Sequence, residues 1–535
     1  MTRERLYLFD TTLRDGAQTA GISFSLDDKV AVARMLDALG IDYIEGGYPG
    51  ANPTDSAFFA TDHALKAKMT AFGMTKRAGR SAANDPGLKA VLDARADAYC
   101  FVAKSWDYHV EVALGISLVE NLDTIRETVR SARVKGEALV DCEHFFDGYK
   151  ANPDYALSCV QAAYEEGARW VVLCDTNGGT LPEEVEAIVA EVVRHVPGSH
   201  LGIHPHNDTG QAVANALAAV RAGARQIQGT LNGLGERCGN ADLVSLIPTL
   251  KLKPAYAQAF DIGVSDEGLR QLTQISRTLD AILNRQPNRH APYVGANAFA
   301  HKGGIHASAV AKDPRTYEHV APEAVGNARK LLVSDQAGRS NVLAELKRVG
   351  IEVDPKDPRV MRLLEEVKER EANGWAFEGA EASFELLARR MLGGVPRFFD
   401  VLSFRVGVER RHNALGELAT VSEAVVKVAV DGEVLMSVAE GNGPVNALDL
   451  ALRKDLGKYQ PYIDDLRLTD FRVRILDGGT GAVTSVALES TDSAGEVWTT
   501  LGVSSNIIDA SFQALEDSIT YKFLKAGAPA PRQSA

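Results

Sequence analysis

The sequence predicts an α/β protein: a (β/α)8 TIM barrel, followed by helical subdomains and a C-terminal α+β domain. Three observations predict this order. Short apolar runs alternate with helical patterns in the first half, polar residues follow almost every run, and the last third changes to a hydrophobic period of two. We expect the barrel over 1–270, helical linker subdomains over 271–395, the C-terminal domain over 396–525 and a disordered tail over 526–535.

The composition is that of an ordinary globular chain. It has 535 residues, 45% of them hydrophobic and 24% charged, with a formal net charge of −13. The acidic balance argues against binding to nucleic acid, and no apolar stretch is long enough to span a membrane. The charged N-terminus is unlike a signal peptide, and the five scattered cysteines form no CxxC pair. We expect a cytoplasmic protein.

Eight apolar runs, each followed by a helical pattern, predict the strands of the barrel. A helical stripe occupies 30–39, and Gly40 stands where that helix should end, as do Gly167 and Gly223 later. Eight units over roughly 250 residues match the barrel, although a doubly wound open sheet has the same local pattern. The predicted strands are 6–9, 43–46, 69–73, 98–102, 138–142, 170–174, 201–204 and 226–230.

Polar residues at the strand ends favour the barrel over the open sheet. In a barrel the carboxyl ends of the strands converge on one mouth, whereas an open sheet would spread them over on the order of tens of ångströms. Nearly every predicted strand is followed by residues capable of chemistry. These are Arg14, Asp15, Glu45, Thr75, Lys104, Glu143, Asp175, Thr176, His204, His206 and Asn232.

A divalent metal site is the chemistry that these residues indicate. His204 and His206 are two apart at a strand end, so both imidazoles point to one side. Asp15 follows the first strand, which lies near them where the barrel closes. Two imidazoles and a carboxylate suit zinc, manganese or iron. The alternative is a hydrogen-bonded pair of histidines. The glycine-rich loop around Asn240 allows close approach to a phosphate or a metal-bound ligand, or is simply a tight turn.

Three motifs resemble a known family. Leu-Arg-Asp-Gly-Ala-Gln at 13–18, followed by ten residues and Lys29, resembles the first signature of the 2-isopropylmalate synthase and homocitrate synthase family. His-Pro-His-Asn-Asp-Thr-Gly at 204–210 resembles its second signature. Gly-Glu-Arg-Cys-Gly-Asn at 235–240 resembles a third shared element. The resemblance implies a metal-dependent enzyme of the Claisen-condensing type on a TIM barrel.

Two further segments, 45–53 and 143–150, resemble the branch of this family that forms citramalate. The resemblance implies that pyruvate accepts a two-carbon unit from acetyl-CoA, giving (R)-citramalate after thioester hydrolysis. An α-keto acid chelates a divalent ion, which then polarises its carbonyl group. Manganese, zinc, magnesium and cobalt all suit the ligand set.

The resemblance also implies roles for single residues. It makes Asp15, His204 and His206 the metal ligands, with Asn240 as a fourth or nearby ligand. Substrate binding falls to Arg14, Asp15 and Thr176. Arg14 can stabilise the developing negative oxygen, and Thr176 can donate to the substrate carboxylate. The alternatives are a salt bridge from Arg14 to a neighbouring strand and a strand cap at Thr176.

A general base must remove a proton from the thioester methyl group. Glu143 is the catalytic residue we expect in this role, with Asp147 as an alternative, because this branch departs from the isopropylmalate synthase pattern there. His306 matches the family's catalytic histidine, with Tyr317 in support, and in the family both reach the partner subunit's barrel. Outside the family context, His306 would be a surface or helix-capping residue.

The C-terminal third predicts a repeated α+β unit. Charged helical patterns at 357–370 and 380–392 precede it, and Asp431-Gly432 signals a hairpin. The first unit has strands at 402–408 and 426–430, followed by a helix from 443 whose apolar stripe includes Leu456. The second unit has strands at 471–475 and 486–488, followed by a helix over 506–523.

This arrangement resembles the family's amino-acid-sensing regulatory domain, which dimerises. For the citramalate branch the resemblance implies isoleucine as the effector and a homodimer. The alternative is an oligomerisation domain without a ligand. Candidate groups for the effector carboxylate are Gly478, Gly479, Gly481 and residues 504–506.

Three other functions stay open. A 2-isopropylmalate or homocitrate synthase would differ only in the pocket for the keto acid. A metal-dependent acyl-CoA lyase or aldolase would share the barrel, although the long C-terminal region argues against it. A non-catalytic amino-acid sensor would not need Arg14, Asp15 and the two histidines.

Overall fold

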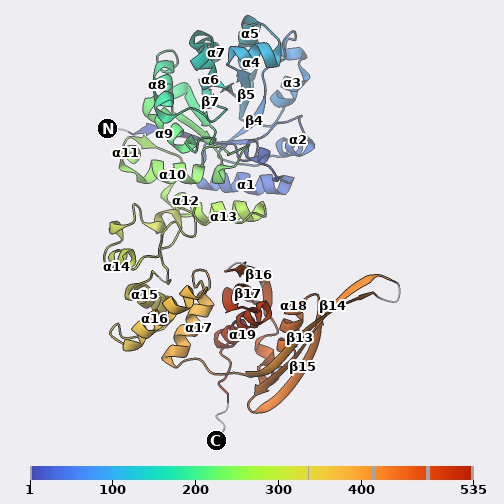
Figure 1. Ribbon diagram of the computed structural model, residues 1–535. Coiled ribbons are helices and arrows are strands. Elements are labelled where there is room, and N and C mark those ends of the chain that lie inside the picture. The colour runs from blue at the N-terminus through green and yellow to red at the C-terminus, as the bar shows by residue number, and fades with distance from the viewer. Residues whose placement is uncertain (1–2, 335, 413–415, 477–481, 532–535) are drawn as a thin grey trace. The chain divides into compact units, whose positions relative to one another are not determined.

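The computed structural model describes residues 3–334, 336–412, 416–476 and 482–531 (Figure 1). The described chain divides into two compact units. The first unit contains the chain up to Phe299 together with Val320–Arg329, and the second contains Ala300–His319 and the chain from Lys330 onward. Within the described residues, every helix is too short or too polar to cross a membrane.

The first unit is a closed barrel of eight parallel strands, which confirms the predicted (β/α)8 fold (Figure 1). The first and last strands pair from Tyr7–Gln226 to Asp10–Gly229, so the sheet has no open edge. The strands are β2 (Tyr7–Asp10), β3 (Tyr43–Gly47), β4 (Lys68–Met74), β5 (Ala98–Lys104), β6 (Glu137–Glu143), β7 (Trp170–Asp175), β8 (Leu201–Pro205) and β9 (Gln226–Gly229).

Helices connect the strands, and their ends follow from local sequence. Ser25 caps the first helix in a reciprocal capping box with Asp28. Gly40 ends it at φ 98°, and a Cβ there would lie 2.6 Å from the carbonyl oxygen of Gly263, so only glycine fits. The principal helices are α1 (Leu26–Leu39), α2 (Pro53–Ala60), α3 (Pro86–Leu92), α5 (Leu118–Ala132), α6 (Phe145–Ala151), α7 (Pro153–Glu165), α8 (Pro182–Val192), α9 (Ala212–Ala222) and α10 (Leu243–Leu252).

The barrel interior has an apolar layer, and three of the strands carry polar side chains nearer the mouth. Phe9, Tyr43, Leu139, Trp170 and Val172 form one buried cluster within the barrel. Because side chains alternate between the two faces of a strand, residues two positions further on point to the same interior. On three strands these inward-facing residues are polar: Glu45 on β3, Asp141 on β6 and Gln228 on β9. On β9 the preceding inward-facing residue, Gln226, is polar as well. The interior therefore has a mainly apolar layer. Glu45, Asp141 and Gln228 form a second layer nearer the mouth, here called the polar layer.

The segments after the eighth strand complete the first unit. Phe260–Asp261 (β10) pairs in parallel with Glu4–Arg5 (β1). The hydroxyl of Thr273 donates to the carbonyl of Val325 at 2.7 Å, which ties Val320–Arg329 to this unit. The helices here are α11 (Pro254–Ala257), α12 (Asp266–Arg270) and α13 (Leu272–Ile282).

The second unit begins with helices, as predicted for the linker subdomains. A small apolar core that includes Val342, Leu363 and Phe384 holds three of them together. Ala300–His301 (β11) pairs with Lys330–Leu331 (β12). The helices are α14 (Gly304–Lys312), α15 (Arg339–Arg348), α16 (Pro358–Ala372) and α17 (Glu381–Leu392).

The rest of the second unit is a repeated α+β arrangement, which confirms the predicted repeat. Each half is a three-stranded antiparallel sheet followed by a helix. Asp431 and Gly432 form the turn of the β14–β15 hairpin at φ 50° and 85°. The halves are β13 (Asp400–His412), β14 (Leu418–Val430), β15 (Glu433–Gly441) and α18 (Pro444–Arg453), then β16 (Arg467–Ile475), β17 (Thr484–Thr491), β18 (Val497–Ser504) and α19 (Ile507–Lys525).

Three details of this unit bear on the predictions. Helix α18 ends at Arg453, so the buried Leu456 is not part of its stripe. The side chain of Asn506 accepts from the backbone of Ile508 at 2.9 Å and caps α19, while Gly478, Gly479 and Gly481 lie outside the described residues. Of the predicted tail, 526–531 is described, and the carbonyl of Pro529 accepts from the hydroxyl of Tyr459 at 3.0 Å.

Candidate metal centre

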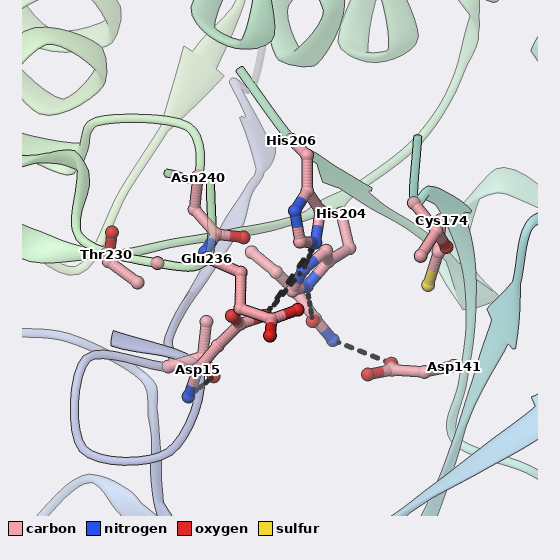
Figure 2. A network of polar contacts seen from close by, with 12 residues as sticks. Asp15, Asp141, Cys174, His204, His206, Thr230, Glu236 and Asn240 are labelled. Carbon is pink, nitrogen blue, oxygen red and sulfur yellow. Dashed lines mark hydrogen bonds and ion pairs between the residues drawn. The ribbon is translucent and has the colours of Figure 1, made fainter. Parts of the chain in front are cut away.

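Asp15, His204 and His206 lie together at the mouth of the barrel (Figure 2). Asp15 is in the turn after β2, His204 is on β8, and His206 directly follows that strand. The Asp15 carboxylate oxygen Oδ2 lies 3.2 Å from His204 Nε2 and 3.8 Å from His206 Nε2. All three side chains are buried, and one donor atom from each lies within 4.8 Å of the others. The residues chosen from the sequence are therefore close enough to share one ion.

Asn240 lies beside this group. Its backbone forms an antiparallel bridge with His206, and its Nδ2 donates to the carbonyl of Leu234 at 3.0 Å. This leaves the amide oxygen pointing toward the two imidazoles (Figure 2). Asn240 Oδ1 and Asp15 Oδ1 are both buried and have no hydrogen-bond partner among the described residues.

Buried oxygen atoms without partners are costly unless another group satisfies them. Two carboxylate or amide oxygens and two imidazole nitrogens form a donor set that suits a divalent cation of borderline hardness. The residues present therefore fit a divalent metal ion.

Asp15 and the two histidines shift one another's pKa values. Burial alone would raise the pKa of Asp15, but the charges of Arg14, His204 and His206 outweigh it and hold that pKa far below its usual range. Burial lowers the pKa of His204, yet its bond to Asp15 raises it overall. Burial and the neighbouring His204 lower the pKa of His206 to about 4. The Asp15 carboxylate is thus ionised, and its charge favours the protonated form of His204 more than that of His206.

Arg14 is fixed between two carboxylates. Its Nε donates to Glu45 Oε2 at 2.7 Å, and its Nη1 lies 3.5 Å from Asp15 Oδ2. The guanidinium carbon lies 4.0 Å from the centre of the Phe72 ring. Burial would lower the pKa of Arg14, but Glu45, Asp15 and Asp141 raise it, so the group stays cationic. The salt bridge to a neighbouring strand, the structural alternative for Arg14, is therefore present and holds the guanidinium at the mouth.

Lys29 anchors the turn that carries Arg14 and Asp15. Its buried ammonium group donates to the carbonyls of Leu13 at 2.9 Å and Gly46 at 2.8 Å, and it forms an ion pair with Asp55. These bonds join the turn after β2 to the end of β3. Lys29 belongs to the first sequence motif, but its role as an anchor of this turn follows only from these contacts in the folded structure.

Thr176 follows β7 at the same mouth. Its hydroxyl oxygen accepts from the backbone N–H of His144 at 2.8 Å, which leaves the hydroxyl proton for another acceptor. The carbonyl of Thr176 accepts from Arg237 at 2.7 Å. The neighbouring Asp175 bonds Thr180 instead. Thr176 is thus a strand cap whose proton is available to a ligand.

The two candidate bases at the end of β6 have different surroundings. Glu143 forms an ion pair with Lys104. Asp147 accepts from Asn177 at 2.9 Å and lies 3.4 Å from His144 Nδ1, and the bond to His144 lowers the pKa of Asp147 despite partial burial. A lowered pKa makes the Asp147 carboxylate a poorer proton acceptor than it would be without the bond to His144.

His306 and Tyr317 belong to the second unit. His306 lies on α14 and is exposed, and Tyr317 is 46% exposed. Their ring centres are 4.3 Å apart, so the two side chains form one pair. The pairing that the resemblance implies is therefore present, and their action at a barrel stays a prediction.

A second cluster, Glu45, Cys100 and Asp141, has donor atoms as close as those of the first. Glu45 accepts from Thr11 and Arg14 through Oε2, whereas its Oε1 has no hydrogen-bond partner among the described residues. Burial and the charges of Asp141 and Glu45 raise the pKa of the Cys100 thiol well above its ordinary value. A protonated thiol is a poor metal ligand, so we interpret this cluster as part of the hydrogen-bonded polar layer.

Asp141 and Gln228 also border the site, although the sequence pattern indicates no role for either residue. Gln228 Oε1 lies 2.7 Å from His204 Nδ1. Gln228 Nε2 donates to Asp141 Oδ1 at 3.1 Å. The available signal was a polar residue within an otherwise apolar strand, which alone does not separate a functional residue from a structural one.

Comparisons with known proteins agree with this architecture. The HMGL-like family model matches residues 5–278, a homocitrate synthase post-HMGL domain-like model matches 293–374, and the LeuA allosteric (dimerisation) domain matches 378–523.

Full-length relatives are also found. The (R)-citramalate synthase of Aquifex aeolicus is 49% identical over 98% of both chains. That of Geobacter sulfurreducens is 50% identical over 97% of this chain and 98% of its own. A probable 2-isopropylmalate synthase of Methanopyrus kandleri is 34% identical over 96% and 97%.

Proposed function

The chain belongs to the HMGL-like family, and we propose that it is an acyltransferase that condenses acetyl-CoA with pyruvate to give (R)-citramalate and CoA. Five relatives named (R)-citramalate synthase match nearly the whole chain at 46–50% identity, which supports this activity over that of a 2-isopropylmalate synthase. The single observation in the structure that supports it is the buried group of Asp15, His204 and His206 beside Arg14.

Asp15, His204 and His206 would hold the ion, with Asn240 Oδ1 as a fourth or nearby ligand. When bound, the ion supplies Lewis-acid polarisation of the keto group of pyruvate. Arg14, cationic and fixed by Glu45, stabilises the negative charge that develops on oxygen. The Thr176 hydroxyl donates to the pyruvate carboxylate.

A base removes one proton from the methyl group of acetyl-CoA, and the resulting carbon attacks the keto carbon. The new alkoxide then takes up a proton, and water cleaves the thioester to release CoA. We assign Glu143 as the base, with His306 and Tyr317 as the further catalytic pair. The ion pair with Lys104 holds the Glu143 carboxylate in place at the end of β6.

The C-terminal region supports a homodimer. On strand β17, Leu488 and Val486 are buried in the core of this unit. Their partners on β16, Phe471 and Val473, point to the same face of the sheet but are 39% and 43% exposed. Large apolar side chains on the core-facing side of an edge strand indicate a surface that a partner covers. We propose that a second copy covers it and that isoleucine acts as effector of this domain.

We keep the division into a barrel over 1–270, helical subdomains over 271–395, a regulatory domain over 396–525 and a tail over 526–535. The ends of the three family matches support it. The five unpaired cysteines are consistent with a reducing cytoplasm.

CoA release with pyruvate, 2-oxoisovalerate and 2-oxoglutarate tests the function. We expect a strong preference for pyruvate, loss of activity after chelation and its return with Mn²⁺. A preference for either larger keto acid would replace citramalate synthesis with the corresponding synthase activity. Cleavage of a hydroxyacyl-CoA without condensation would indicate a lyase. The same assay with isoleucine added tests the effector.

A further inference from the structure

His204 is held from behind by a chain of two buried side chains. Its Nδ1 lies 2.7 Å from Gln228 Oε1, and Gln228 Nε2 donates to Asp141 Oδ1 at 3.1 Å. All three residues are almost fully buried. His204, Gln228 and Asp141 are on β8, β9 and β6, so the chain crosses the barrel interior in its polar layer.

The chemistry of the three groups fixes the direction of both bonds. A carboxylate oxygen only accepts, so the end of the Gln228 amide that faces Asp141 is the NH2 group. The carbonyl end of the amide therefore faces His204, and Nδ1 of that imidazole carries the proton. Its other nitrogen, Nε2, is the atom that faces Asp15 and His206.

We propose that Gln228, oriented by Asp141, is a positioning residue that fixes the tautomer of His204 and presents its Nε2 to the metal. This inference rests on the proposed metal site. A partner that accepts the distal N–H of a ligating histidine commonly affects metal affinity by roughly tenfold to a hundredfold. Here the acceptor is an amide, and the carboxylate acts one residue further away.

The buried layer explains why an amide stands in this position. Asp15 already contributes one carboxylate to the centre, and Glu45 and Asp141 contribute two more nearby. Their positive counterpart in this layer is Arg14, whose pKa all three carboxylates raise. A further carboxylate at position 228 would face Asp141 and increase the unpaired negative charge. Asp141 orients the Gln228 amide, and the amide in turn accepts from His204, so His204 is oriented without a further charge in this layer.

Gln226 provides a matched control. It lies two residues before Gln228 on β9, so its side chain points to the same interior, and it is also fully buried. Neither its Oε1 nor its Nε2 has a hydrogen-bond partner within the described part of the chain. Gln226→Met therefore makes the same chemical change in the same strand without removing a bond to the site.

The experiment measures Mn²⁺ binding to the full-length protein by the EPR signal of the free ion, together with the melting temperature of the metal-free protein. We expect Gln228→Met to weaken Mn²⁺ binding at least tenfold while the metal-free protein stays folded, with a melting temperature below that of Gln226→Met because His204 and Asp141 each lose a buried partner. Gln226→Met should bind Mn²⁺ within about threefold of the wild type. Equal binding by Gln228→Met and Gln226→Met would overturn the proposal.

A double exchange tests the direction of the bonds. In Asp141→Asn with Gln228→Glu, the new asparagine donates and the new glutamate accepts from both neighbours, so the bond to His204 is retained. We expect Mn²⁺ affinity within about threefold of the wild type. A folded double variant that binds Mn²⁺ tenfold more weakly would contradict the proposal, and this variant decides the matter if Gln228→Met does not fold.

The readout separates this inference from the proposed function. Metal affinity does not depend on which keto acid the protein uses, so an unexpected substrate would leave the result intact. If the wild type itself bound no Mn²⁺ or Zn²⁺, the metal centre would fail and the positioning role with it. If the wild type binds metal and the Gln228 variants bind it equally well, only the positioning role fails.

Discussion

The Nε2 atoms of His204 and His206 lie 3.2 Å apart, and both face the same carboxylate oxygen of Asp15. Two imidazoles at this distance cannot both carry a proton on the facing nitrogens without repulsion. The lowered pKa of His206, about 4, and the raised pKa of His204 reflect this arrangement. A single divalent ion would compete with protons for these nitrogens and interact with all three side chains at once.

The first prediction concerns these ligands. Asp15→Asn and His206→Ala should each reduce kcat/KM by at least roughly a thousandfold and weaken Mn²⁺ binding at least tenfold, because the first removes the anionic charge of a ligand and the second removes an imidazole. Circular dichroism should show an unchanged fold. His195 pairs with Glu191 and lies away from the carboxyl ends of the strands, so His195→Ala is the control and should behave like the wild type. Wild-type turnover in Asp15→Asn would exclude the proposed centre.

Arg14→Lys provides a second test. A lysine has one donor group, so it cannot keep both the Nε bond to Glu45 at 2.7 Å and the Nη1 contact with Asp15 at 3.5 Å. We expect kcat to fall roughly a hundredfold or more, as when a donor to a developing oxyanion is removed, with a smaller change in KM for pyruvate. An increase in KM alone would instead assign Arg14 to ground-state binding.

The barrel and the main site were predictable because both follow from periodicity along the strands. Apolar runs located each strand to within a few residues, and the residues after the strands located the mouth. His204 and His206 share one strand end, and Asp15 follows the strand that closes the ring, so their meeting required only the barrel topology.

The supporting residues were not predictable, because their roles depend on contacts across the fold. Lys29 bonds two carbonyls from different loops, and Gln228 acts only through Asp141, which is far away in sequence. A glutamine within a strand usually indicates an exposed face, yet Gln228 is fully buried. In the C-terminal region, the alternating pattern gave the strands, but it also extended the stripe of α18 to Leu456, beyond the end of that helix.

Lys29→Met tests how the turn after β2 is anchored. The substitution leaves Asp55 buried without its cation and frees the carbonyls of Leu13 and Gly46. Removing one partner of a buried ion pair commonly costs about 3–5 kcal/mol in the free energy of unfolding. We expect a loss of that size in urea unfolding, together with reduced kcat. Adding Asp55→Asn should recover part of the stability, because no uncompensated charge then remains. Additive losses in the double variant would contradict this pairing.

A pH prediction follows from Asp10, at the end of β2. Burial is the main cause that raises its pKa to about 7, against the bonds from Thr12 that lower it. The folded protein therefore keeps this proton up to about pH 7, whereas the unfolded chain loses it near the ordinary value of 3.8. The unfolded state binds fewer protons in this window, so the contribution of Asp10 to stability falls as pH rises from about 4 to 7, by on the order of 4 kcal/mol.

Asp10→Asn should remove this dependence while keeping both contacts with Thr12, because an amide oxygen can accept from its backbone N–H and an amide nitrogen can donate to its hydroxyl. We expect the variant to melt several degrees above the wild type at pH 8 and close to it at pH 4. Asp62→Asn, on an exposed turn, is the control. A variant that melts below the wild type at pH 8 would show that the ionised carboxylate is stabilising.

The last prediction concerns the proposed dimer. Val473→Glu places a charge on the exposed part of the core-facing side of β16, and dimer formation would have to bury it. We expect sedimentation to show a shift from dimer toward monomer, with circular dichroism unchanged because Val473 is already 43% exposed in the single chain. Met436→Glu is the matched control, on β15 of the other sheet and 63% exposed. If Met436→Glu dissociates the dimer and Val473→Glu does not, the interface lies on the first sheet instead.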